Sequence, residues 1–182
     1  MHEDFTPSRI FVNKNYKGFY AYDIAVIQLN RTVHFKPHIL PICLPWNGLL
    51  SESEEALVSG WGRTSNSDDY KGKLRYTRVE VVSNAECAEY SKVNVSPMVR
   101  TETILCAGSI YSSICDGDSG GPLVVRRNGR AVLIGLVAGR RKNCESRQLG
   151  LYANISSQIP WIRRHTERIE LRAIPFTGIQ RA

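Results

Sequence analysis

The sequence predicts an all-β protein, a barrel or a sandwich of short strands, with one helix at its C-terminal end. Six runs of six to nine residues are rich in β-branched and aromatic residues and are mostly bounded by Gly, Asn, Asp or Ser. An Asn-Gly pair between two of these runs is a strong hairpin signal. Helical periodicity is convincing only near the end of the chain. With 182 residues, 42% of them hydrophobic, the chain is long enough for one domain, or slightly more, with a buried core.

The predicted strands lie, in order, at residues 23–29, 56–62, 74–82, 122–127, 131–138 and 149–155. Asn128-Gly129 joins the fourth and fifth strands in a two-residue turn. The helix is expected to follow Ser156 as its cap, with Pro160 in its first turn. One face of this helix carries Ile159, Ile162 and Ile169. The remaining residues, with Pro175 and Gly178, predict a basic tail.

The net charge of +7 does not indicate nucleic-acid binding, because the basic residues are dispersed or gather at 140–142 and in the tail. No run of 18 apolar residues exists, so no membrane-spanning helix is expected, and the first residues do not form a signal peptide. The sequons at Asn30, Asn94 and Asn154 favour a secreted, glycosylated protein. Five widely spaced cysteines contain no Cys-x-x-Cys or Cys-x-x-His pair, so no zinc site is expected. We expect no other metal and no cofactor.

The segment Gly117-Asp118-Ser119-Gly120-Gly121-Pro122 carries a single hydroxyl among glycines. Acyl transfer needs a hydroxyl in a tight turn, with backbone N–H groups directed at the developing oxyanion. Glycines permit such a turn and keep side chains away from the substrate carbonyl. Ser119 is therefore a candidate nucleophile.

Around this segment the chain resembles the trypsin/chymotrypsin family of serine endopeptidases, from about Tyr20 to Ile169. CDGDSGGP resembles the nucleophile loop of the family, YDIAVIQL the strand that carries its catalytic aspartate, and ILPICLP the connector between its two barrels. LVSGWGRT resembles a strand of the second barrel, NAEC and ILCAG a pair of disulfide arms, and GLYANISSQIPWI the closing strand and terminal helix.

This resemblance implies the second six-stranded antiparallel barrel of a chymotrypsin-like double β-barrel, the last strands of the first barrel, and a C-terminal α-helix. We expect a remnant of the first barrel at 1–35, the connector at 36–55, the second barrel with its helix at 56–170 and a basic tail at 171–182.

The resemblance also implies roles for individual residues. Ser119 would be the nucleophile, and the N–H groups of Gly117 and Ser119 would form the oxyanion hole. Asp118 would receive the new N-terminal ammonium of the activated enzyme. Asp23 would orient the base imidazole.

The base itself is not found. In the family a histidine precedes the aspartate in an Ala-Ala-His-Cys context, and none of His2, His34, His38 and His165 has that context. Two interpretations follow. The chain is a piece of a secreted serine protease that acts on proteins or peptides, inactive in isolation, or it is a non-catalytic, protease-like binding module.

The resemblance implies disulfides Cys87–Cys106 and Cys115–Cys144. Cys43 would then be unpaired in this chain. In family members whose catalytic chain stays tethered, the corresponding cysteine bonds an N-terminal regulatory segment.

The substrate pocket implied by the resemblance has Ser113 at its base, followed by Ile114, so the carboxylate that selects Arg or Lys is absent. Its lining strand would be Ala138-Gly139-Arg140, and Gly150 would keep the far wall open. Arg140, paired with Asp116, would obstruct the pocket or favour an acidic side chain. If Arg140 points to solvent, the preference would be for apolar residues.

Overall fold

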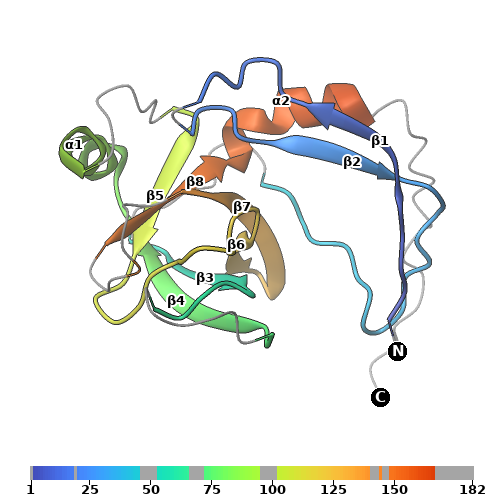
Figure 1. The fold of residues 1–182 in the computed structure, drawn as a ribbon, viewed down its shortest axis with the longest axis horizontal. Coiled ribbons are helices and arrows are strands. Elements are labelled where there is room, and N and C mark those ends of the chain that lie inside the picture. Colours follow the sequence, from blue (N-terminus) through green and yellow to red (C-terminus); the bar gives the residue numbers. More distant parts are fainter. Residues whose placement is uncertain are drawn as a thin grey trace.

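The computed structural model describes residues 2–18, 20–45, 53–65, 72–94, 102–139, 144 and 148–166. Its strands are β1 (Pro7–Val12), β2 (Ala25–Leu29), β3 (Glu55–Gly60), β4 (Arg75–Val81), β5 (Ile104–Gly108), β6 (Pro122–Arg127), β7 (Arg130–Gly139) and β8 (Leu149–Asn154). Its helices are α1 (Asn84–Asn94) and α2 (Ile155–Thr166). Figure 1 shows a barrel at one end of the molecule and the β1–β2 pair extending from it beside α2.

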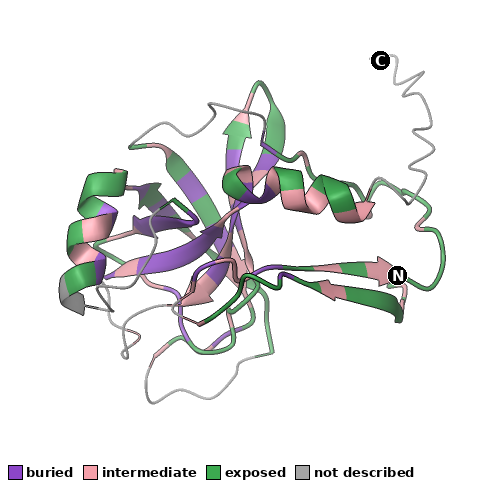
Figure 2. Ribbon diagram, turned by 90° about the horizontal axis from the view of Figure 1, so that it is seen from above, coloured by how far each residue is buried: buried purple, intermediate pink, exposed green. Residues whose placement is uncertain are grey.

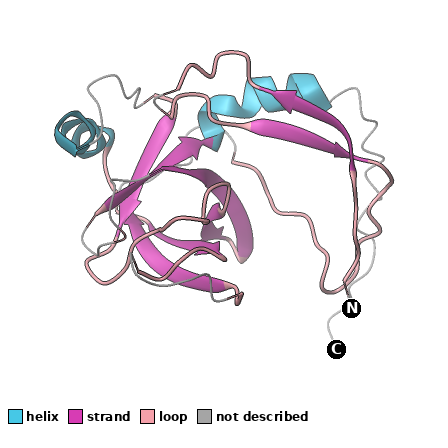
Figure 3. Cartoon of the chain, viewed as in Figure 1, coloured by secondary structure: helices cyan, strands magenta, loops and turns pink. Residues whose placement is uncertain are grey.

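The barrel is a closed antiparallel sheet of six strands, as expected, and their order is β3-β4-β5-β8-β7-β6. Figure 3 shows these strands wrapped around one another at one end of the molecule. Closure leaves no unpaired sheet edge and gives every strand an inner face. Inward-facing apolar side chains fill it, among them Val58, Val79, Leu105, Leu123 and Ile134, each at most 4% exposed. The alternation of apolar and polar residues in the sequence therefore corresponds to the inside and outside of this barrel.

The β6–β7 hairpin turns at Asn128-Gly129, as predicted. Both residues have positive φ, 50° and 74°. A two-residue turn of this kind needs positive φ at both central positions, and Asn and Gly tolerate it best.

The β1–β2 pair is a separate two-stranded antiparallel sheet, which we call the ribbon. Ile10 pairs with Ile27, and Phe11 pairs with Val26. Phe11 faces α2, where its ring centroid lies 5.3 Å from that of His165.

The buried Asn13 ties the ribbon to α2, because its Nδ2 donates a 3.1 Å hydrogen bond to Oε1 of the buried Gln158. Asn13 also donates its backbone N–H to the carbonyl of Ile24, 3.2 Å away. The bond to Gln158 spans 145 positions of the sequence.

The structure corrects the expected start of the terminal helix. α2 begins at Ile155, and the cap is Asn154 rather than Ser156. Asn154 Oδ1 accepts the Ser157 backbone N–H at 3.4 Å, and its carbonyl accepts the Ser157 hydroxyl at 2.8 Å. Pro160 consequently lies inside the helix, beyond its first turn. The last residues of the predicted helix, from 167, and the predicted tail lie outside the described residues.

Three elements were not predicted: β1, α1 and β5. Ser83 caps α1, since its Oγ accepts the Glu86 backbone N–H at 3.1 Å, and Ser83 and Glu86 form the Ser-x-x-Glu pattern that the sequence contained. Its residues show almost no amphipathic pattern, so periodicity did not identify it. β5 is a short run buried on both faces, between the barrel interior and a second cluster around Cys87.

Candidate active site

Ser119 lies at the corner of two consecutive tight turns. The Asp118 N–H donates to the Cys115 carbonyl at 3.1 Å, and the Gly121 N–H donates to the Asp118 carbonyl at 2.8 Å. The third residue of each turn is a glycine with positive φ, Gly117 at 93° and Gly120 at 80°. This geometry explains the glycine spacing and leaves Ser119 exposed.

The Ser119 loop is fixed to β7 and β3. The Gly120 N–H donates to the Val137 carbonyl at 2.8 Å, and the Val137 N–H donates to the Gly121 carbonyl at 2.9 Å. A Cβ on Gly121 would lie 2.5 Å from the Ser59 carbonyl oxygen, so only glycine allows this close approach. The backbone that carries Ser119 is therefore held by the barrel wall.

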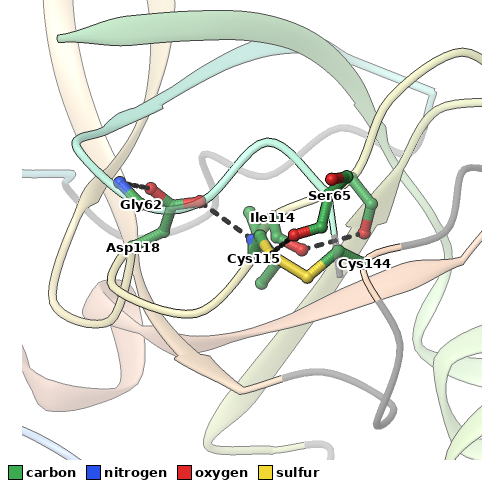
Figure 4. The surroundings of a disulfide bond; sticks show 7 residues. Gly62, Ser65, Ile114, Cys115, Asp118 and Cys144 are labelled. Atoms are coloured by element: carbon green, nitrogen blue, oxygen red, sulfur yellow. Dashed lines mark hydrogen bonds between the residues drawn. A yellow bond between two sulfur atoms is a disulfide. The ribbon is translucent and has the colours of Figure 1, made fainter. Parts of the chain in front are cut away.

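The Asp118 carboxylate is held by two backbone N–H groups (Figure 4). Oδ1 accepts the Gly62 N–H at 2.8 Å, and Oδ2 accepts the Cys115 N–H at 2.9 Å. A Cβ on Gly62 would lie 2.5 Å from Oδ1, and Gly60 also borders this carboxylate closely. Our sequence reasoning did not assign Gly60 and Gly62 to the site, although the Ser-Gly-Trp-Gly segment was a signal for them.

Two disulfides occur among the described residues, Cys87–Cys106 and Cys115–Cys144, the same pairs that the resemblance implied. Cys115–Cys144 joins the start of the Ser119 loop to the segment between β7 and β8 (Figure 4). Cys43 is free and half-buried. Its backbone carbonyl accepts the Leu133 N–H at 2.9 Å and its N–H donates to the Ala131 carbonyl at 3.2 Å, so the segment around Cys43 lies against β7.

A cavity of about 250 Å³ lies beside the Ser119 loop. Its lining includes Ser113, Ile114 and Asp118 from the loop region, and also Cys144, Tyr76 and Tyr111. Tyr152 is 1% exposed, and burial, together with the Asp118 carboxylate, raises the pKa of its hydroxyl. Tyr152 therefore remains neutral.

Asp23 lies two residues before β2, directly after a backbone turn at residues 20–22. Tyr20 and Tyr22 have positive φ, 63° and 57°, and the Ile24 N–H donates to the Tyr22 carbonyl at 2.8 Å. Such conformations are uncommon for bulky residues and cluster at functional sites. Partial burial raises the pKa of Asp23.

The Asp23 segment touches the barrel through Tyr20, whose ring lies directly over Gly139 at the end of β7. Any side chain at position 139 would collide with this ring.

Ala138 and Gly139 lie at the end of β7 as expected, whereas Arg140 lies outside the described residues. The Asp116 carbonyl accepts the Arg63 backbone N–H at 2.9 Å.

The histidines lie apart from these groups. His165 packs between the rings of Phe11 and Trp161, with Nδ1 2.8 Å from the Trp161 carbonyl oxygen. His34 and His38 are exposed in the segment after β2, and Nε2 of His2 lies 3.8 Å from Oδ2 of Asp4. In the described part of the chain, no hydrogen bond or ion pair joins a histidine to Ser119 or Asp23.

The fold and the Ser119 loop define the class of protein, and comparisons with known proteins agree. The sequence profile of the Trypsin family matches residues 1–162. Vitamin K-dependent protein C of Mus musculus is 35% identical over 174 residues, which cover 89% of this chain and 37% of that protein. Serine proteinase stubble of Drosophila melanogaster is 34% identical over 149 residues, 80% of this chain and 19% of that protein. CLIP domain-containing serine protease C9 of Anopheles gambiae is 33% identical over 175 residues, 87% of this chain and 48% of that protein.

The chain therefore belongs to the trypsin family of serine proteases, with a chymotrypsin-like barrel. It spans less than half the length of each of these three relatives. In the described residues, neither helix has the length and apolar character needed to cross a membrane.

Proposed function

We propose that this chain is the nucleophile-bearing part of a secreted serine endopeptidase that cleaves proteins or peptides through an acyl-enzyme. The observation that carries the proposal is the position of Ser119, exposed at the corner of a double turn that the barrel wall fixes. In this mechanism, Ser119 Oγ attacks the scissile carbonyl carbon, and its proton passes to an imidazole base. The N–H groups of Gly117 and Ser119 stabilise the oxyanion, and Asp23 orients the imidazolium.

We assign the base to a histidine other than the four in this chain, carried by a preceding segment of the same protein. The packing of His165 between two aromatic rings and the exposed positions of His2, His34 and His38 support this assignment. The same segment would contribute the N-terminal ammonium that pairs with Asp118, and it would offer Cys43 a disulfide partner. In isolation, the chain would then be inactive.

The second candidate function is a non-catalytic, protease-like binding module. The segment Ala138-Gly139-Arg140 favours it, because it stands where the family usually has Ser-Trp-Gly to line the substrate groove. The ring of Tyr20 lies against Gly139, at the place of the missing tryptophan side chain. A module of this kind would keep the barrel and its loops but would not turn over peptides.

Labelling with a fluorophosphonate probe separates these functions. The isolated chain should not be labelled, whereas protein expressed from a longer transcript that encodes an Ala-Ala-His-Cys segment should be labelled at Ser119. Ser119→Ala in the longer protein is the matched control and should abolish labelling. If the longer protein, correctly activated, remained unlabelled, the binding-module function would be favoured.

A further inference from the structure

Ile114 is almost completely buried although it lies in the loop that carries Ser119. Its exposed fraction is 4%, and it belongs to the same apolar cluster as Val58, Leu123 and Tyr152 in the barrel interior. Its neighbour Ser113 remains half-exposed. The Ile114 side chain therefore points into the protein between the loop and the barrel strands.

The atoms that Ile114 meets are on β8. A Cβ built on Gly150 would lie 2.9 Å from Ile114 Cδ1 and 3.0 Å from Tyr152 Oη. The space beside Gly150, which the sequence suggested would be open, is thus bordered by the end of the isoleucine side chain and by the tyrosine hydroxyl. Glycine at position 150 leaves room for Ile114 rather than for a ligand.

Burial and charge limit which substrate side chains could enter the space beside Gly150. Ser113 offers a hydroxyl and no charge, so a guanidinium or ammonium at the base would be desolvated without gaining an ion pair from this residue. A phenyl or indole ring would have to displace Ile114 Cδ1 from Gly150, in a close-packed interior that does not readily accommodate extra volume. A side chain of the size of a methyl or hydroxymethyl group needs neither an ion pair nor a displacement of Ile114.

We propose that Ile114 determines specificity by filling the depth of the substrate pocket, so that the protein accepts small side chains, of the size of alanine or serine, at the residue before the scissile bond. This inference rests on the proposed function, because the assignment of the substrate pocket to Ser113, Ile114 and Gly150 follows from the resemblance to serine endopeptidases. The structure supplies the contact by which Ile114 occupies the space beside Gly150.

The closed space is tested first, by stability and without substrate. Gly150→Ala should lower the melting temperature by about 3–10 °C in the wild-type chain, because its Cβ meets Ile114 Cδ1. In an Ile114→Ala background the same substitution should lower it clearly less, because only the contact with Tyr152 remains. If Gly150→Ala had the same effect in both backgrounds, the two side chains would not share this space and the inference would be wrong.

The pocket is then tested with indole, which mimics an aromatic side chain and needs no catalysis. Chemical-shift changes on titration should show no specific binding to the wild type and saturable binding to Ile114→Gly. Ile114→Val removes only Cδ1 and serves if the glycine variant does not fold, with weaker binding expected. Saturable indole binding to the wild type near Gly150, or none to a folded Ile114→Gly, would overturn the proposal.

Peptide cleavage by the longer, activated protein distinguishes a failure of the proposal on Ile114 from a failure of the proposed function. The wild type should prefer alanine over phenylalanine before the scissile bond by at least about tenfold in kcat/KM. Ile114→Gly should reverse that preference. Efficient wild-type cleavage after phenylalanine or arginine would refute the role of Ile114 and leave the proposed function standing. Absence of any cleavage would refute the proposed function, while the stability and indole results would still decide whether the space is closed.

Discussion

The barrel and the ribbon have apolar strands in common but differ in what those strands bury. In the barrel, six strands close on themselves, and their inner faces form a core whose largest residues are less than 2% exposed. In the ribbon, two strands pair only with each other, and the face turned away from α2 exposes Ile10, Val12 and Ile27 to more than half of their surface. Figure 2 shows this contrast, with buried residues gathered in the barrel and exposed ones along the ribbon. Apolar strands thus bury a core of their own only where enough of them pair to form a closed sheet.

A matched pair of isoleucines is expected to give the largest difference between the two regions. Ile134→Ala in β7 should destabilise the chain by about 2–5 kcal/mol, because it leaves a cavity where the side chain is 0% exposed. Ile10→Ala in β1, where the side chain is 57% exposed, should change stability by less than about 0.5 kcal/mol. Urea denaturation measures both, and equal effects would contradict the contrast.

Loss of the Cys87–Cys106 disulfide should weaken the barrel region by about 3 kcal/mol in the chain-entropy model, since the bond closes a loop with a sequence separation of 19. The double variant Cys87→Ala/Cys106→Ala avoids free thiols. Cys43→Ala is its control and should have a much smaller effect, because Cys43 forms no disulfide. Hydrogen exchange should show the loss of protection in β5 and α1 before β1 and β2. The reverse order would show that this bond supports the ribbon.

The link between the ribbon and α2 is tested by Asn13→Ala, which leaves the buried Gln158 amide without its partner from the ribbon. We expect a loss of about 1–3 kcal/mol. Amide exchange should accelerate in β1 and β2 more than in the barrel, since the lost bond holds the ribbon. Exposed Asn15, whose side chain makes no hydrogen bond among the described residues, supplies the control Asn15→Ala. Uniform acceleration across both regions would contradict the idea of a local tie.

The smallest expected effect concerns Asp23. Burial raises its folded-state pKa above the unfolded value, so the folded state binds more protons between these two pKa values. Its contribution therefore lowers stability as the pH rises through this window, and the full destabilisation is present above the folded pKa. Asp23→Asn should slightly raise the stability at pH 7 and flatten this part of the pH profile. A decrease in stability at pH 7 would indicate a favourable partner for the carboxylate.

Much of the barrel could be predicted because its signals are local. The strand around Val58, the Asn128-Gly129 hairpin and the strand before Asn154 all have alternating or β-rich sequences bounded by turn residues, and the structure shifts their limits by a few residues at most. β5 was missed because its four leading residues are buried on both faces, so it shows no alternation. β1 was missed because its apolar residues follow one another without alternation and stay largely exposed, and the strand is defined by its pairing with β2.

By itself, the sequence determined that short strands would form, that a glycine-rich turn would present Ser119, and that the chain resembled serine endopeptidases. These depend on residue type and on neighbours within a few positions, so they can be read along the chain. Only the tertiary structure decided that Ile114 would fill the space beside Gly150, that Tyr20 would cover Gly139, and that Asp118 would be held by the Gly62 N–H. Each of these joins residues from separate strands or loops, and the approach of their atoms depends on how the closed barrel brings those segments together.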